Sequence, residues 1–99
     1  MFDVIYNLAK KYHLKSVYLF GSQARNEADE LSDVDLVVDN TNSLATGLSF
    51  FTFQRELEDM LHRKVDVLTI DEVDNATTYI GQRVRENYLK DRVLVYEEA

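Results

Sequence analysis

Residues 17–38 read VYLFGSQARNEADELSDVDLVV, and the order of residue types in this stretch decides the fold. An apolar run ends at Gly21 and Ser22, and a second apolar run follows Asp33 and Asp35. Short apolar runs bounded by Gly, Ser and Asp are typical of buried strands. We therefore expect two core strands, joined by a segment that begins with a tight turn and ends with two carboxylates.

The turn at Gly21 and Ser22 has the composition of a phosphate-binding element. Small residues where a strand passes into a helix let backbone N–H groups approach a phosphate closely. Ser22 is expected to cap a short helix over residues 23–28. Arg25 lies one turn further on, where it is placed either to neutralise phosphate charge or to pair with Asp29 on the helix surface.

Three aspartates are candidates for metal ligands and for catalysis. Asp33 and Asp35 have strand spacing, so their side chains point the same way. Asp66 stands between two valines in an apolar run, where a carboxylate is costly to bury unless it is paired or metal-bound. If its strand neighbours that of Asp35, the three carboxylates converge at one end of the sheet. Taken singly, Asp33 and Asp35 are better explained as solvated loop ends, and Asp66 is equally well explained as a surface residue on an edge strand.

Carboxylate and phosphate oxygens are the ligands that Mg²⁺ prefers. Asp33 and Asp35 are therefore expected to hold a Mg²⁺ ion against a triphosphate. Asp66 is expected to help hold a second ion and to accept the proton of an attacking hydroxyl. Attack at the α-phosphorus would then release pyrophosphate.

The rest of the chain alternates between helical and strand patterns, which indicates an α/β layer fold. We expect helices over 2–13, 44–62 and 71–90, and strands over 16–20, 34–39, 64–70 and 92–96. Ser43 and Asp71 are expected to cap the second and third helices. Gly47 weakens the start of the second helix by about 1 kcal/mol relative to Ala.

The expected helix 44–62 carries more apolar side chains than one face can bury. Its stripe comprises Leu44, Leu48, Phe51, Leu57, Met60 and Leu61, widened by Phe50 and Phe53. Three phenylalanines in four positions cannot all face one core. The alternatives are a wide core stripe with one exposed ring, or a docking surface for a protein partner.

Length and composition exclude several classes of protein. The 99 residues predict a single domain over 1–99 with a modest core, which favours association with a partner. The absence of cysteine excludes disulfides and thiolate chemistry. The net charge of −7 argues against general nucleic-acid binding. With neither a long apolar segment nor a signal-peptide pattern, we expect a cytoplasmic protein without a membrane span.

Gly21-Ser22, ten intervening residues and Asp33-Val34-Asp35 resemble the signature of the DNA polymerase β-like nucleotidyltransferases. Within that superfamily the chain is similar to the minimal nucleotidyltransferases, the MntA-type antitoxins that pair with HEPN-domain toxins. The segment around Asp66 looks like the one that carries the third carboxylate. Gln23 and Asn26 depart from the basic residue and the glycine frequent in the turn motif, which bears on turn geometry and nucleotide affinity.

The resemblance implies a small mixed sheet flanked by helices. It also implies an antitoxin enzyme that transfers AMP from ATP to a tyrosine of a HEPN ribonuclease toxin and so silences it. Two alternatives stay open from the sequence. The chain could neutralise a partner by occlusion without catalysis, or it could modify a small hydroxyl compound or an RNA end.

Overall fold

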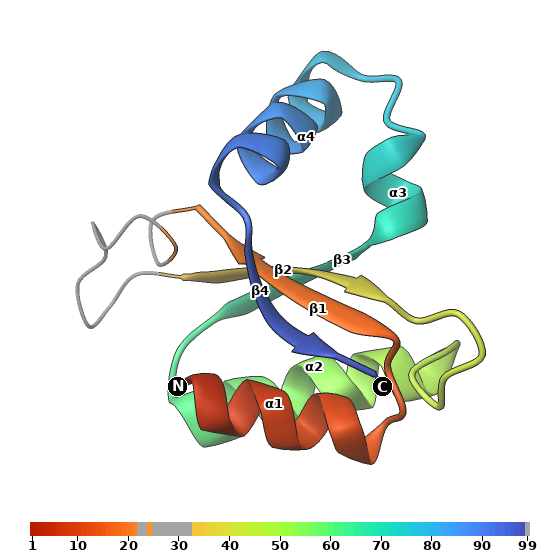
Figure 1. Cartoon of the computed structure of the whole chain (residues 1–99), viewed down its shortest axis with the longest axis vertical. Helices are drawn as coiled ribbons and strands as arrows, with labels where there is room; N and C mark the ends of the chain where they lie inside the picture. The colour runs from red at the N-terminus through yellow and green to blue at the C-terminus, as the bar shows by residue number, and fades with distance from the viewer. Residues whose placement is uncertain (22–23, 25–32, 99) are drawn as a thin grey trace.

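The computed structural model describes residues 1–21, 24 and 33–98. Along these residues helices and strands alternate much as the sequence predicts (Figure 1). The elements are α1 (Phe2–Lys11), β1 (Ser16–Phe20), β2 (Val34–Asp39), α2 (Leu48–Leu61), β3 (Val65–Thr69), α3 (Ile70–Asp74), α4 (Tyr79–Asp91) and β4 (Val93–Glu97). None of the helices within these ranges is long and apolar enough to cross a membrane.

The strands form one mixed sheet in the order β3-β2-β1-β4. β1 runs antiparallel to both of its neighbours, whereas β3 runs parallel to β2. This arrangement confirms the predicted mixed α/β fold. The four strands begin and end within one residue of the predicted bounds.

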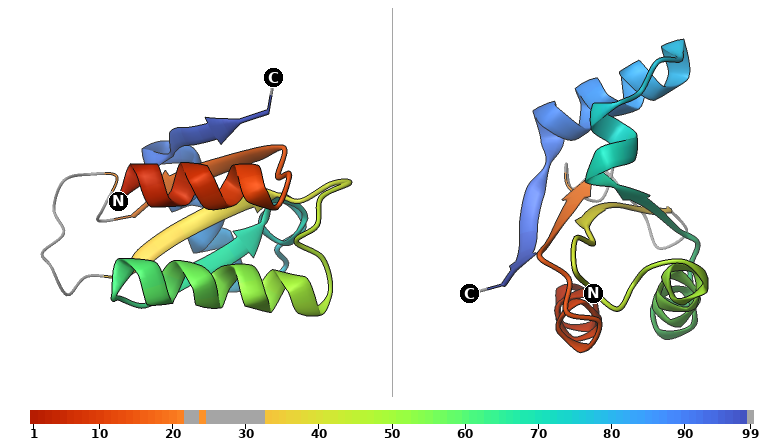
Figure 2. Two further views of the ribbon diagram at one scale, coloured as in Figure 1. Left: turned by 90° about the horizontal axis from the view of Figure 1, so that it is seen from below. Right: turned by 90° about the vertical axis from the view of Figure 1, so that its right-hand side faces the viewer.

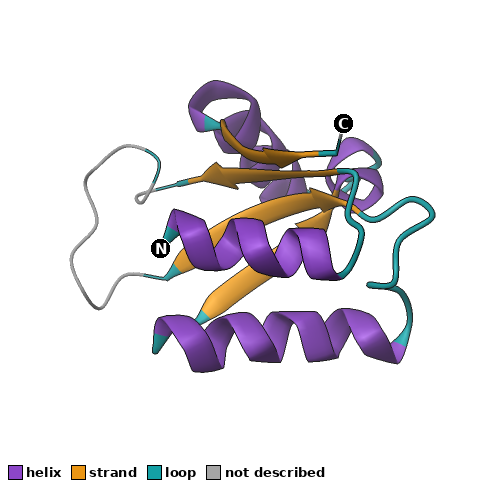
Figure 3. Ribbon diagram, turned by 60° about the horizontal axis from the view of Figure 1, so that its bottom comes forward, coloured by secondary structure: helices purple, strands orange, loops and turns teal. Residues whose placement is uncertain are grey.

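Helices cover both faces of the sheet. α1 and α2 lie on one face, and α3 and α4 lie on the other (Figures 1 and 2). The strands alternate accordingly, with Val17 and Leu19 of β1 packing in the core under α1 and α2 while Phe20 packs with Tyr88 of α4. Figure 3 shows α1 and α2 side by side, with α1 in front of the strands and α2 below them. The face that α3 and α4 cover therefore also carries the end of β1, where Phe20 meets α4.

The second helix begins later than the expected 44–62. Gly47, with a φ of 56°, is the residue before α2, and Ser43 instead accepts a turn hydrogen bond from Ala45 N at 3.1 Å. The buried stripe consists of Phe53 and Leu57, flanked by Phe50 and Leu61. The predicted core positions Leu44, Leu48, Phe51 and Met60 are exposed. The prediction was wrong there because the stripe through Phe53 and Leu57 faces the sheet.

The expected helix 71–90 is two helices. Thr69 caps α3 by accepting a hydrogen bond from Glu72 N at 3.2 Å, and Thr78 caps α4 by accepting one from Gly81 N at 3.0 Å. Two threonine caps define two helix starts, so the chain turns between them. The prediction that Asp71 caps one long helix was wrong: it lies in the first turn of α3.

A polar contact joins the end of α1 to α2, at the end of the sheet away from Asp35 of β2 and Asp66 of β3. The Tyr12 hydroxyl donates to the Glu56 carboxylate, which also pairs with Lys11 Nζ at 3.0 Å. Burial and this bond raise the pKa of Tyr12 to about 12. The bonds from Tyr12 and Lys11 lower the pKa of Glu56. The contact is therefore formed by a neutral phenol and a charged carboxylate.

Replacing Tyr12 by Phe is expected to lower the free energy of unfolding by about 1–2 kcal/mol near neutral pH, because a partly buried hydrogen bond to a charged group is lost. Since folding raises the pKa of Tyr12 from 10.0 to about 12, its contribution is complete below pH 10 and is lost as the pH rises toward 12. Glu56 contributes above its ordinary pKa and loses its effect as the pH falls.

Urea unfolding at neutral pH and between pH 10 and 12 measures both effects. The difference between wild type and Tyr12→Phe should shrink across the alkaline range. Tyr79→Phe is the matched control, because Tyr79 is 74% exposed. An equal change in both variants would show that the Tyr12 contact does not stabilise the fold.

Candidate active site

Strand register brings two of the predicted aspartates together. Asp35 of β2 is the register partner of Asp66 on β3, and on its other side it is the partner of Phe20 on β1. Register partners point to the same face, with strands about 4.8 Å apart. Both carboxylates therefore stand in one row across the sheet, on the face that carries α3 and α4.

Gly21, the residue after β1, lies against the Asp35 carboxylate at one end of this row. Its φ of +78° lies in the left-handed region, and a Cβ at this position would stand 2.7 Å from the Asp35 Oδ2 atom. Only glycine lets the backbone turn here while the Asp35 carboxylate lies against it. Backbone and carboxylate are thus in direct contact at the end of β1, where the sequence predicts a phosphate.

Replacing Gly21 by Ala is expected to reduce nucleotide affinity about tenfold or more. The methyl group would displace the Asp35 carboxylate, and the left-handed backbone strains any other residue by about 1 kcal/mol or more. Calorimetric titration with a non-hydrolysable ATP analogue measures the loss, and thermal unfolding monitors stability. Gly47→Ala is the matched control, because it also has a positive φ but no atom within 4 Å of the added Cβ. Equal affinities in the two variants would refute the close-contact argument.

A cavity of about 590 Å³ surrounds the two aspartates, a volume within the ~300–1,000 Å³ of small-molecule sites. Its lining comes from β1, β2, β3, α2 and α4 and comprises Phe20, Gly21, Asp35, Gln54, Asp66, Val67, Leu68, Val84 and Asn87. Sequence reasoning missed Gln54 and Asn87. Each neighbours a buried aromatic on its helix, and no pattern distinguishes such a residue from an ordinary surface one.

Side chains of α2 fix the start of β3. Gln54 Nε2 donates to the Val65 carbonyl at 2.9 Å, and Val65 N donates to Glu58 Oε2 at 3.2 Å. These bonds satisfy the outward backbone groups of an edge strand next to Asp66. The position of Asp66 is therefore set by α2 as well as by pairing with β2.

The other predicted site residues are placed less closely. Asp33 is exposed and directly precedes β2. Ser22 and Arg25 lie outside the described residues, as does the expected short helix 23–28 except for Ala24. The assignment of these side chains to phosphate or metal stays a prediction.

The donor set fits Mg²⁺ as it is usually bound in phosphate-transfer sites. Such sites commonly supply one or two carboxylates, and the substrate phosphates complete the coordination. Asp35 and Asp66 meet this requirement. Within residues 1–21, 24 and 33–98, no group of three acidic or histidine side chains is gathered closely enough to hold a metal ion.

Lys64 lies beside Asp66 on the solvent-exposed edge of the sheet. Lys64 Nζ lies 3.8 Å from Asp66 Oδ1, and the Asp66 side chain is 46% exposed. A surface ion pair of this kind contributes about 0–1 kcal/mol. The Asp66 carboxylate is therefore accessible to a ligand that replaces the lysine.

An aromatic group supports the opposite wall. Tyr88 packs edge-on against Phe20, with ring centroids 6.0 Å apart, and against Tyr18 at 5.8 Å. The Arg92 guanidinium lies over both tyrosine rings and donates to the Tyr88 hydroxyl at 3.2 Å. This bond raises the pKa of Arg92. The group anchors α4 to β1 and so fixes the cavity wall.

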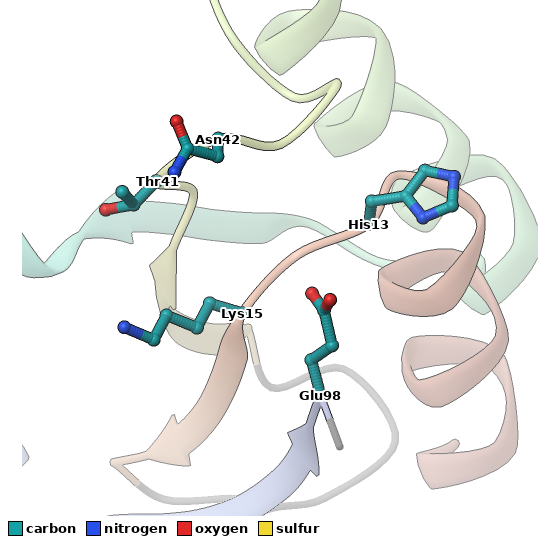
Figure 4. A pocket seen from close by; sticks show the side chains of 5 residues that line it. All are labelled: His13, Lys15, Thr41, Asn42 and Glu98. Atoms are coloured by element: carbon teal, nitrogen blue, oxygen red, sulfur yellow. The ribbon is translucent and has the colours of Figure 1, made fainter.

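A second cavity, of about 500 Å³, lies at the opposite end of the sheet. Figure 4 shows the side chains that line it: His13, Lys15, Thr41, Asn42 and Glu98. It is far from Asp35, because Lys15 N bonds the carbonyl of Asp39 at the other end of β2. Its lining holds one carboxylate beside a lysine and a histidine, which is not the donor set of a metal site.

Residues 3–98 match the family model described as "Polymerase beta, Nucleotidyltransferase". The chain therefore belongs to this nucleotidyltransferase family, as the Gly-Ser and Asp-x-Asp spacing predicts.

Relatives from Methanocaldococcus jannaschii bear the name "Putative protein adenylyltransferase". MJ0126 is 34% identical over 82 residues, and MJ0128 is 37% identical over 82 residues. Each alignment covers 83% of this chain and 81% of the relative. The chain is thus similar to proteins of that name across most of both sequences.

Solved structures confirm the fold. A toxin–antitoxin complex with AMP-PNP contains a chain that superposes with a TM-score of 0.71 at 18% identity, covering 98% of this chain and 73% of the other. A chain of the MntA–HepT toxin–antitoxin complex superposes with a TM-score of 0.62 at 17% identity, covering 98% and 70%. At these identities the similarity concerns the fold.

Proposed function

We propose that this chain transfers AMP from ATP to a hydroxyl group of a protein partner, a tyrosine of a HEPN ribonuclease toxin. The observation that carries the proposal is the pairing of Asp35 with Asp66 across β2 and β3, with Gly21 against the Asp35 carboxylate. A nucleotidyltransferase needs a close backbone approach to phosphate beside adjacent carboxylates. Both features lie in one cavity.

The residues of the site divide the chemistry between them. The backbone at Gly21 and Ser22 holds the β- and γ-phosphates, and Arg25 neutralises their charge. Asp35 and Asp66, which are register partners, are the pair that would hold Mg²⁺, with Asp33 as a further ligand on the sequence prediction; the ion stabilises charge on the phosphate oxygens when bound. The partner's hydroxyl oxygen bonds to the α-phosphorus, the bond to the β-phosphate oxygen breaks, and pyrophosphate leaves. Asp66 accepts the hydroxyl proton.

A protein acceptor is supported by the relatives and by the surface. The M. jannaschii relatives bear the name "Putative protein adenylyltransferase", and the structural neighbours are toxin–antitoxin complexes. On α2, Leu48 is 86% exposed and Phe51 is 66% exposed. Large exposed apolar side chains one turn apart are typical of a protein interface. A partner bound at this surface would form a hetero-oligomer with the chain. The use of ATP as the AMP donor is consistent with a cytoplasmic location.

The direct test uses the purified protein, α-labelled ATP, Mg²⁺ and the protein encoded by the neighbouring gene. We expect label on the partner, at a tyrosine identified by mass spectrometry, and none when the label is on the γ-phosphate. Transfer should stop when EDTA removes Mg²⁺. Folded protein that leaves the partner unlabelled under these conditions would contradict the proposal.

The second candidate function is neutralisation by occlusion, favoured by the exposed Leu48 and Phe51. In that case the partner's ribonuclease activity falls on mixing even without ATP. Replacing both residues by Ser should then abolish neutralisation and binding together. The same measurement with ATP separates the two functions, because catalysis needs the nucleotide and occlusion does not.

A further inference from the structure

The cavity around the aspartates continues onto an apolar wall that the proposed chemistry does not use. Leu68 follows Asp66 by two residues on β3 and so points to the same face. Val84 and Asn87 reach the cavity from α4, one turn apart. Leu68 and Val84 also line an apolar groove of about 330 Å³ beside α3 and α4, which lie side by side on this face (Figure 1).

We infer that Leu68 and Val84 contact the base of the nucleotide substrate and that Asn87 selects adenine. The inference rests on the proposed function, which places the triphosphate at Gly21 and the α-phosphate at Asp35 and Asp66. The nucleoside then continues from Asp66 along the face of β3 toward Leu68, which pairs with Val37 of β2. In that direction the cavity presents Leu68 and Val84, and an apolar wall suits the faces of a purine ring.

Asn87 has the chemistry to distinguish adenine from guanine. Its amide is on an exposed part of α4, and no hydrogen bond joins it to the described residues. A side-chain amide offers a donor beside an acceptor, which matches the ring nitrogen and amino group of adenine in a bidentate pair. Guanine presents two acceptors at the equivalent edge, so the amide oxygen of Asn87 would face an acceptor and lose its hydrogen bond. Asn87 therefore favours ATP over GTP.

Calorimetric titration of the whole chain with Mg²⁺ and three probes tests the inference: a non-hydrolysable ATP analogue, the matching GTP analogue and inorganic tripolyphosphate. Wild type should bind the ATP analogue more tightly than the GTP analogue. Asn87→Ala should weaken the ATP analogue about 3- to 10-fold, as the loss of one or two hydrogen bonds implies, and should remove the preference. Tripolyphosphate should bind equally to both proteins. Gln82→Ala, elsewhere on the exposed surface of α4, should leave all three affinities unchanged.

The outcomes separate this inference from the proposed function. A wild-type preference for ATP that survives in Asn87→Ala would overturn the role of Asn87. Parallel loss of tripolyphosphate binding in that variant would also overturn it, because the residue would then act on phosphates. Failure of wild type to bind tripolyphosphate or either nucleotide would overturn the proposed function, and this inference with it. Val84→Ser provides a second check, with weaker nucleotide binding and unchanged tripolyphosphate binding expected.

Discussion

Replacing Asp33 and Asp35 together by Asn should reduce AMP transfer to the partner by roughly 10³-fold or more. The carboxylates that would hold Mg²⁺ against the triphosphate are removed, and that charge stabilisation contributes several kcal/mol to the transition state. Each 1.36 kcal/mol corresponds to about a factor of ten in rate. Single-turnover transfer of labelled AMP measures the effect. Binding to the partner should be unchanged, since exposed apolar side chains such as Leu48 and Phe51 lie on α2 and not in this cavity.

The matched control is Glu97→Gln with Glu98→Gln. It changes the net charge equally, but both residues are exposed and lie at the opposite end of the sheet, where Glu97 pairs with Ser16. Transfer at the wild-type rate in the double aspartate variant would contradict a role for these carboxylates. Lost transfer with undiminished neutralisation of the toxin would instead support occlusion. Lost transfer with lost neutralisation and retained binding supports catalysis.

The fold was largely predictable because its strands have strong local signals. The apolar runs around Val17, Leu36 and Val67 are bounded by Gly, Asn or charged residues, and each becomes a strand. The predictions were wrong where tertiary contacts or capping decide. Phe51 and Phe53 have equal hydrophobicity, but only Phe53 faces the sheet. One helical periodicity ran through 71–90, yet the cap at Thr78 starts a new helix there.

The candidate site was predictable in part, for the same physical reason. Residue spacing places Asp35 at the start of a strand, but only the parallel pairing of β2 with β3 sets Asp66 opposite it. The close contact of Gly21 with Asp35 likewise depends on the pairing of β1 with β2. Gln54 and Asn87 belong to helices whose rotation about the sheet decides which side chains reach the cavity. Local sequence contains no signal for that rotation.

Replacing Asp66 by Asn should separate nucleotide binding from chemistry. Asp66 lies on the edge strand, away from Gly21 and next to open solvent, where an acceptor hydroxyl can approach. If it accepts the hydroxyl proton, its loss should slow AMP transfer by about 10²–10³-fold, the range of general base catalysis. Affinity for a non-hydrolysable ATP analogue should change by less than about threefold, since Asp33, Asp35 and the backbone at Gly21 remain. Single-turnover transfer and calorimetric titration measure the two quantities separately.

Lys64→Ala is the control for this variant, because it breaks the same 3.8 Å ion pair from the other side and keeps the carboxylate. An exposed pair contributes about 0–1 kcal/mol, so transfer should stay within about fivefold of wild type. Equal losses in both variants would show that the ion pair positions the edge strand and that Asp66 has no chemical role. If Asp66→Asn transfers AMP at the wild-type rate, a group other than Asp66 accepts the hydroxyl proton. In either case the pairing of β2 with β3 would explain nucleotide binding but not the reaction.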